Sequence, residues 1–169
     1  PSRTNIRRSG EEVAPGDLLA RAGSRLTPPM LAWLAGFGIV EVDVYLPPRV
    51  AVLTTGQELV DFREVPKAGQ IRNTNQLFLE QLLRMENVVP AFGGIVPDTL
   101  EETQARMTSA LREADVLLMS GGVSMGEHDH VRTAARSLGF RELFWKVAQK
   151  PGKPLYFARR DDQLIFGLP

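Results

Sequence analysis

Cysteine is absent from the sequence, and neither sign of charge is in excess. Without cysteine, the chain forms no disulfide bond, has no thiolate nucleophile and binds neither zinc nor an iron–sulfur cluster through sulfur. Lysine and arginine together number 20, as do aspartate and glutamate, so the formal net charge is zero. Because a protein that coats nucleic acid needs an excess of positive charge, we expect no nucleic-acid partner.

Long apolar runs and several common catalytic motifs are also missing. The apolar runs fall far short of a membrane span and no signal-like region opens the chain, so we expect an intracellular protein that does not bind membranes. The sequence contains no Gly-Lys-Ser/Thr P-loop, no Gly-x-Ser-x-Gly elbow and no glycine trio after a strand. These absences argue against an ordinary NTPase, hydrolase or dehydrogenase.

The first part of the chain, residues 1–47, is rich in Gly, Pro and Arg. A short helix is predicted after Thr27 as N-cap, with two prolines in its first turn and Gly36 or Gly38 at its end. Residues 39–46 alternate like a half-buried strand. We therefore expect a partial, β-rich accessory segment of an upstream domain, with its boundary at the double proline before residue 49.

The second part, residues 48–169, alternates between predicted strands and helices. Strands are expected at "VAVLTT", "NVVPAFGGIV", "DVLLMS" and "ELFWKVA", and helices at "NQLFLEQLLRM", "LEETQARMTSALREA" and "HVRTAARSLGF". A closing hairpin is expected to turn around residues 160–162. This order predicts a three-layer α/β/α domain with a mostly parallel sheet. Because the chain starts at Pro1 and stops abruptly at Pro169, we expect a fragment of a longer polypeptide.

Three of the predicted strands end in chemically unusual loops. "VAVLTT" leads into Gly56-Gln57-Glu58, "DVLLMS" leads into residues 121–124 ("GGVS"), and "ELFWKVA" leads into residues 149–154 ("QKPGKP"). Ligands of open α/β sheets bind beyond the carboxyl ends of the strands. We therefore expect hydroxyls, bare backbone amides, carboxylates and lysines to meet in one crevice.

The glycine pair predicts an anion site. Gly121 and Gly122 have no side chain, so backbone N–H groups can approach a ligand closely, and the following helix N-terminus favours negative charge. Lys150 and Lys153 can supply cations to the same site. The alternative is a tight turn that needs glycine for its conformation alone.

Carboxylates beside an anion suggest a bridging divalent cation, for which Mg²⁺ with oxygen ligands fits Glu58 and Asp129. The alternatives are a solvated loop residue for Glu58 and a helix-dipole interaction for Asp129. On local grounds Asp98 is expected to be an N-cap, paired with Glu101 in an acidic capping box.

Polar residues also precede the first helix of this part, where Asn73, Thr74 or Asn75 is expected to be the N-cap. The two histidines, His128 and His130, are weak candidates for a metal site and are expected at a partly exposed helix start.

Several stretches, in the same order along nearly the whole chain, resemble the molybdopterin molybdenumtransferases, the MoeA family that includes the gephyrin E domain. The stretches are "NIRRSGEEVAPGDLLARAGSRLTPP", "PRVAVLTTGQELV", "GQIRNTNQLFLEQLL", "SGGVSMGEHDHV", "FWKVAQKPGKPLYFA" and "IFGLP". The last resembles the opening of the family's Gly-Leu-Pro-Gly-Asn-Pro motif. The resemblance implies that residues 48–169 are a molybdopterin-binding domain truncated at its C-terminus.

The resemblance also implies a function. Members of the family are cytosolic in bacteria, bind adenylylated molybdopterin and insert molybdate with Mg²⁺ or a similar ion, releasing AMP. It implies catalytic roles for Glu58, Asp98, Asp129, Lys146 and Lys150, with Glu58 and Asp129 as metal ligands. The substrate-binding residues that it implies are Thr55, Gly56, Thr74, Asn75, Gly121, Gly122, Val123, Ser124, Pro151, Gly152 and Lys153.

The chain departs from the family pattern at several positions. Gln57 stands where Asp or Asn is usual, and His128 and His130 replace the commoner Lys and Tyr around Asp129, so contacts and tuning of the site are expected to change. In the family, residues before and after this segment complete the fold, the cleft and a homodimer. We therefore expect the isolated fragment to bind ligand weakly and to turn over little or nothing.

Two other functions remain open at this point. One is a molybdopterin adenylyltransferase or a related nucleotide-processing homologue, in which the same domain usually occurs without the upstream "NIRRSGEE" segment. The other is a gephyrin-like scaffold that docks protein partners. The sequence favours the molybdenumtransferase over both, because it contains the upstream segment and shows no docking linker.

Overall fold

The chain consists of two units that we describe separately. The computed structural model describes residues 6–123 and 130–169, and contacts divide the chain into Pro1–Tyr45 and Leu46–Pro169. The described part of the first unit contains the helix α1 (Pro28–Gly36), which follows Thr27 and has proline in its first turn, as predicted.

The strand expected over residues 39–46 is not formed, and the described part of residues 1–47 therefore lacks the expected β-rich character. Val40 and Tyr45 are each 90% exposed, and Leu46 is 88% exposed. An alternating pattern produces a strand only where a second strand completes its hydrogen bonds. Among the described residues, no strand pairs with residues 39–46, so their alternating pattern does not produce a strand.

The second unit is built on a six-stranded sheet with the order β4-β1-β5-β8-β7-β6. The strands are β1 (Val50–Thr55), β4 (Phe92–Val96), β5 (Val116–Ser120), β6 (Arg141–Trp145), β7 (Tyr156–Arg160) and β8 (Gln163–Leu168). Strands β4, β1, β5 and β8 are mutually parallel, whereas β7 is antiparallel to both β8 and β6. The predicted mostly parallel sheet is confirmed, and every strand of it except β7 has its carboxyl end at the same edge.

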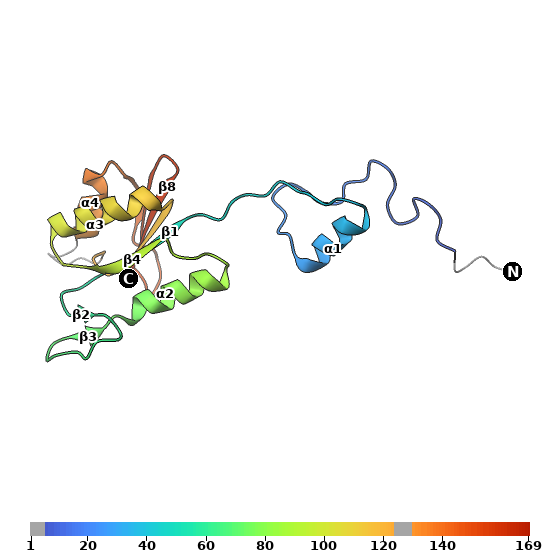
Figure 1. Cartoon of the computed structure of the whole chain (residues 1–169). Coiled ribbons are helices and arrows are strands. Elements are labelled where there is room, and N and C mark those ends of the chain that lie inside the picture. Colours follow the sequence, from blue (N-terminus) through green and yellow to red (C-terminus); the bar gives the residue numbers. More distant parts are fainter. Residues whose placement is uncertain (1–5, 124–129) are drawn as a thin grey trace. The chain divides into compact units, whose positions relative to one another are not determined.

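Helices cover the two faces of this sheet, as predicted for a three-layer domain. Figure 1 shows α3 (Leu100–Glu113) and α4 (His130–Ser137) on one face and α2 (Thr74–Met85) on the other. The main core lies on the α3–α4 face and includes the fully buried Leu53, Leu117 and Met119.

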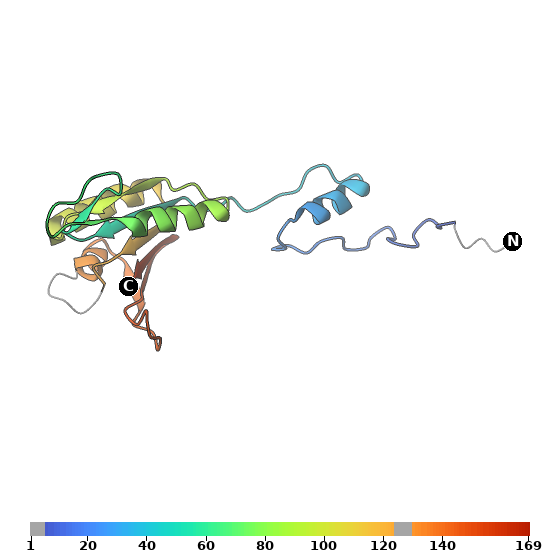
Figure 2. The ribbon, with the colours of Figure 1, turned by 90° about the horizontal axis from the view of Figure 1, so that it is seen from below.

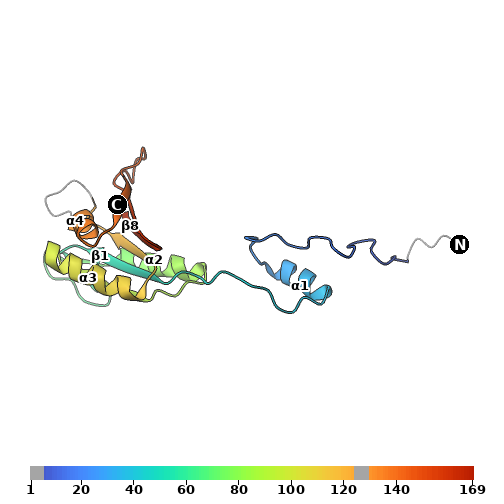
Figure 3. The ribbon, with the colours of Figure 1, turned by 90° about the horizontal axis from the view of Figure 1, so that it is seen from above.

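In Figure 2, α2 and α3 lie along the part of the sheet that contains β1. The hairpin of β7 and β8, in red, lies at the other side of the sheet. Figure 3 shows the same arrangement from the opposite side. No helix in the described ranges is both long and apolar enough to cross a bilayer.

A small parallel pair, β2 (Leu59–Val60) and β3 (Ile71–Arg72), was not predicted. The Ile71 N–H donates to the Glu58 carbonyl and the Asn73 N–H donates to the Val60 carbonyl, both at 2.8 Å. Strands of two residues carry no periodic pattern, so sequence analysis has no signal for them. The pair matters because it fixes Glu58 beside the start of α2.

The N-cap of α3 is Thr99 and not Asp98, which corrects the sequence-based assignment. The Thr99 hydroxyl accepts a hydrogen bond from the Glu102 N–H at 3.3 Å. Both Asp98/Glu101 and Thr99/Glu102 have the spacing of a capping box. Thr99 has the extended backbone (φ −129°, ψ 150°) that an N-cap requires, and α3 starts at the next residue.

α4 ends just before a left-handed glycine, and the last hairpin turns within the predicted residues 160–162. After α4, Gly139 adopts a left-handed backbone (φ 82°), and the Phe140 N–H donates to the Ala135 carbonyl, which closes the helix. Between β7 and β8, residues 161 and 162 form a two-residue turn, in which Asp161 has φ 50°. A positive φ in a two-residue turn matches the twist of the hairpin.

An ion pair joins the amino ends of the central strands β1 and β5. The Arg49 guanidinium donates to Asp115 at 2.7 and 3.2 Å, and the Arg49 N–H donates to the same carboxylate at 2.9 Å. These hydrogen bonds lower the pKa of Asp115 and raise the pKa of Arg49. Since both side chains are largely exposed, we expect only a modest contribution to stability.

The lowered pKa of Asp115 predicts how this contribution depends on pH. It is present while the carboxylate is ionised, and it is lost as the pH falls below about 4 towards the lowered pKa. Asp115→Asn should therefore be less stable than wild type at pH 7, and the difference should shrink at pH 3. Urea unfolding at both pH values measures it, with Asp162→Asn in the exposed hairpin turn as control. An equal difference at both pH values would contradict this account.

Candidate functional site

A cavity of about 240 Å³ lies at the carboxyl ends of β1 and β5. Because these strands are parallel neighbours, Thr54 lies opposite Ser120 and the loops that follow emerge side by side. The cavity is lined by Thr54, Thr55, Glu58, Leu59, Ile71, Arg72, Asn73, Thr74, Asn75, Ser120, Gly121 and Pro169. It therefore brings together residues from both strand ends, from the β2–β3 pair and from the start of α2.

The two glycines after β5 are required by their backbone and by their contact with β1. Gly121 and Gly122 have φ of 86° and 67°, in the left-handed region. A β-carbon at Gly121 would lie 2.7 Å from the Thr55 carbonyl oxygen, and one at Gly122 would lie 2.9 Å from the Thr55 hydroxyl oxygen. Glycine is therefore required at both positions by the backbone conformation and by the contact with Thr55. At Gly121 the same turn brings bare backbone to the cavity.

The start of α2 faces the same cavity and is fixed by Asn73. The Asn73 side chain accepts the Gln76 N–H at 3.2 Å, which confirms the predicted N-cap cluster and identifies Asn73 as the cap. Its amide group donates to the Thr54 hydroxyl at 2.7 Å, and Asn73 is only 3% exposed. The N-terminus of α2, with its partial positive charge, is thus attached to the end of β1.

Sequence analysis missed part of this cavity. Asn75, which was predicted, donates from its side-chain amide to the Ser120 hydroxyl at 3.0 Å. Ser120, Thr54 and Arg72 also line the cavity but were not assigned to the site. Part of their signal is in the sequence, because Thr54 and Ser120 are hydroxyl residues at the carboxyl ends of two apolar strands.

Glu58 reaches the cavity, and its carboxylate folds back over Gly56. A β-carbon at Gly56 would lie 2.9 Å from either carboxylate oxygen of Glu58. No group of three or more potential metal ligands occurs among the described residues. One exposed carboxylate still fits Mg²⁺, which is often held by one or two carboxylates together with phosphate oxygens of the substrate.

Other predicted residues are not among those that line the cavity. Ser124, Asp129 and His128 lie outside the described residues. Asp98 is half-buried just before α3 and does not line the cavity.

The predicted lysines lie on the connection between β6 and β7. Lys150 and Lys153 are exposed and do not line the cavity. Gly152, in the left-handed region, approaches the rim, since a β-carbon there would lie 3.9 Å from Pro169, which does line the cavity. The loops after β1 and β5 thus both line the cavity, as expected. The lysine loop reaches only its rim, next to Pro169.

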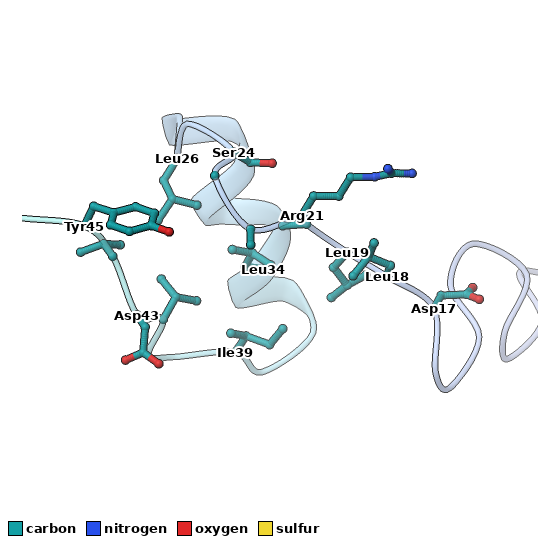
Figure 4. Close-up of a pocket in the computed structure, with 15 residues that line it drawn as sticks. Asp17, Leu18, Leu19, Arg21, Ser24, Leu26, Leu34, Ile39, Asp43 and Tyr45 are labelled. Carbon is teal, nitrogen blue, oxygen red and sulfur yellow. The ribbon is translucent and has the colours of Figure 1, made fainter.

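A larger hollow of about 900 Å³ lies in the first unit (Figure 4). Its lining is mainly apolar, from side chains such as Leu18, Leu26, Leu34 and Ile39, with Asp43 and Arg21 at its margin. None of the predicted site residues lines it. The smaller cavity at the strand ends combines hydroxyls, amides, a helix N-terminus and a carboxylate, which suits a polar anionic ligand that brings or shares a cation.

The chain belongs to the family described as "Probable molybdopterin binding domain", whose profile matches residues 51–169. It is similar to the molybdopterin molybdenumtransferase of Haemophilus influenzae, with 39% identity over 165 residues, which cover 98% of this chain and 41% of that protein. The chain therefore spans about two fifths of that relative's length.

Solved structures give the same assignment. The molybdopterin biosynthesis MoeA protein of Pyrococcus horikoshii superposes with a TM-score of 0.77 at 31% identity, over 95% of this chain and 39% of that one. The molybdopterin biosynthesis enzyme MoaB of Thermus thermophilus has a TM-score of 0.55 at 23% identity, over 73% of this chain and 81% of that one. The second likeness supports the fold alone.

The close approach between Gly121 and Thr55 predicts a position that does not accept a side chain. Gly121→Ala should destabilise the fold by about 1–3 kcal/mol from its backbone conformation alone, and by more because of the clash. Gly69→Ala is a matched control, because Gly69 has a similar φ of 82° but open space around its α-carbon. Urea unfolding of both variants measures the difference. Equal losses would show that the contact with Thr55 has no cost.

Proposed function

We propose that this chain is the molybdopterin-binding part of a longer molybdenumtransferase, which inserts molybdate into adenylylated molybdopterin and releases AMP. The observation that carries the proposal is the similarity to the Haemophilus influenzae molybdenumtransferase, which covers 98% of this chain and so includes both units. A molybdopterin adenylyltransferase is less well supported, since the MoaB likeness covers 73% of the chain and concerns the fold alone.

The cavity suits the phosphate region of such a substrate. The N-terminus of α2 provides N–H donors and partial positive charge for phosphate oxygens, and the missing side chain at Gly121 lets a ligand approach the backbone closely. The side chains of Thr55, Thr74 and Asn75 can donate further hydrogen bonds there. These groups are held before the ligand arrives, because Asn73 fixes α2 on Thr54 and Asn75 is bonded to Ser120. Such preorganised donors stabilise charge that develops in the transition state.

The reaction opens the phosphoanhydride between molybdopterin phosphate and AMP, so negative charge grows on the departing phosphate oxygen. Glu58 would hold Mg²⁺ there, with Asp129 as second ligand, and the bound ion would neutralise part of that charge. Lys146, Lys150 and Lys153 would bind phosphate or molybdate, with Asp98 nearby. Of these lysines, Lys150 and Lys153 are exposed and do not line the cavity, so they would supply cations without crowding it. We also propose that the complete protein is a cytoplasmic homodimer.

The test of this function uses the complete polypeptide that contains the chain. Incubation with adenylylated molybdopterin, molybdate and Mg²⁺ should release AMP, and omission of molybdate should abolish the release. Chromatography of AMP measures the outcome. If the protein instead attaches AMP to free molybdopterin from ATP, it is an adenylyltransferase and the proposal is wrong.

Removal of the charge at Glu58 should impair the same reaction. Glu58→Gln is expected to lower the rate of AMP release by roughly 10²-fold or more, because a metal ligand is lost, while the fold stays intact. Glu64→Gln, in the exposed connection between β2 and β3, is the control and should leave the rate unchanged. The rate at several Mg²⁺ concentrations separates weaker metal binding from slower chemistry. A wild-type rate in Glu58→Gln would refute the metal role.

A further inference from the structure

We propose that Trp145 is a positioning residue that holds the glycine turn after β5 and the lysine loop after β6 in one fixed arrangement. The inference rests on the proposed function for the identity of the ligand, but its geometry is independent of that function. The sheet keeps the two loops apart, so a further contact is needed if both are to act on one substrate.

Sheet order separates the two loops. Strands β8 and β7 lie between β5 and β6, so three strand spacings, roughly 14 Å, separate the strands from which the loops emerge. Backbone pairing therefore does not bring the turn at residues 121–123 next to the loop that begins at Lys146. A contact made by a side chain has to do so.

Trp145, the last residue of β6, makes that contact. Its indole N–H donates to the Val123 carbonyl at 3.0 Å. Val123 is 1% exposed and lies over β8, where a β-carbon at Gly167 would collide with its Cγ1 atom. The absence of a side chain at Gly167 therefore gives Val123 the room to lie across the sheet towards Trp145.

The indole ring is itself held by charged neighbours. The Arg132 guanidinium lies 3.4 Å from the ring centroid, and the Lys146 ammonium lies 3.9 Å from it. Arg132 is fixed in turn by a two-pronged ion pair with Glu142, with N–O distances of 3.0 to 3.2 Å. Both members of this pair are about three quarters buried, and cation–π contacts strengthen when they are partly desolvated.

Lys146 connects this arrangement to the loop. Its backbone is left-handed (φ 76°), which is costly for a residue with a side chain, and its N–H donates to the Leu155 carbonyl at 2.8 Å. Lys146 therefore both contacts the Trp145 ring and begins the loop. The Trp145 ring and its N–H together link the anion-binding backbone at Gly121–Val123 to the first lysine of the cationic loop.

The test replaces Trp145 with phenylalanine, which keeps an aromatic ring but removes the N–H donor. Trp33→Phe is the matched control, because Trp33 lies in the first unit and packs edge-on against Phe37. Gly167→Ala breaks the same link from the other side, since its β-carbon would displace Val123, and it decides the question if Trp145→Phe does not fold.

Two measurements on the complete polypeptide that contains this chain are required. Hydrogen exchange should accelerate in residues 121–123 and 146–155 together in Trp145→Phe, and in neither in Trp33→Phe. Affinity for free molybdopterin should fall about five- to tenfold in Trp145→Phe, the scale expected for one hydrogen bond, at a temperature where circular dichroism shows full folding. Unchanged exchange, acceleration in only one loop, or a wild-type affinity would overturn the proposal.

The two measurements also separate this inference from the proposed function. If the complete wild-type polypeptide shows no affinity for molybdopterin, the proposed function loses its support, and hydrogen exchange alone decides the role of Trp145. If Trp145→Phe is less stable but binds molybdopterin as tightly as wild type while folded, Trp145 is only a packing residue and the proposal is wrong.

Discussion

The site depends on the parallel pairing of β1 with β5. This pairing places Thr55 directly against the turn formed by Gly121 and Gly122, at distances that exclude any side chain on either glycine. Because the carboxyl ends of parallel strands lie at one edge, the pairing also sets the mouth of the cavity. The start of α2 is attached to the same strand end, through the hydrogen bond between Asn73 and Thr54.

The positive potential at the mouth of the cavity comes mainly from backbone N–H groups. The chain as a whole has no net charge, so its long-range attraction of an anion is weak and the proposed anion binding depends on local donors. The α2 N-terminus and the glycine turn supply such donors, while Glu58 adds the negative charge that a shared cation would balance. The lysine loop lies further out and joins the turn through Trp145.

Much of the fold was predictable because its elements carry strong local signals. The apolar run of β1, the amphipathic α3 and the glycine at the end of α4 each have one reasonable interpretation. The N-cap of α3 shifted by one residue because Asp98 and Thr99 both satisfy the capping-box spacing, and only the backbone conformation separates them. The strand expected over residues 39–46 failed because a strand needs a partner, which local alternation does not reveal.

The sequence by itself determined the family, the alternation of strands and helices, and the residue types that can bind an anion. The family follows from motifs that occur in the same order along nearly the whole chain. The elements and the residue types follow from local sequence. Tertiary structure alone decided which of these residues meet, since sheet order is a non-local property. It placed Glu58, Asn75 and Ser120 around one cavity, left Lys150 outside its lining, and joined the separated loops by one indole N–H.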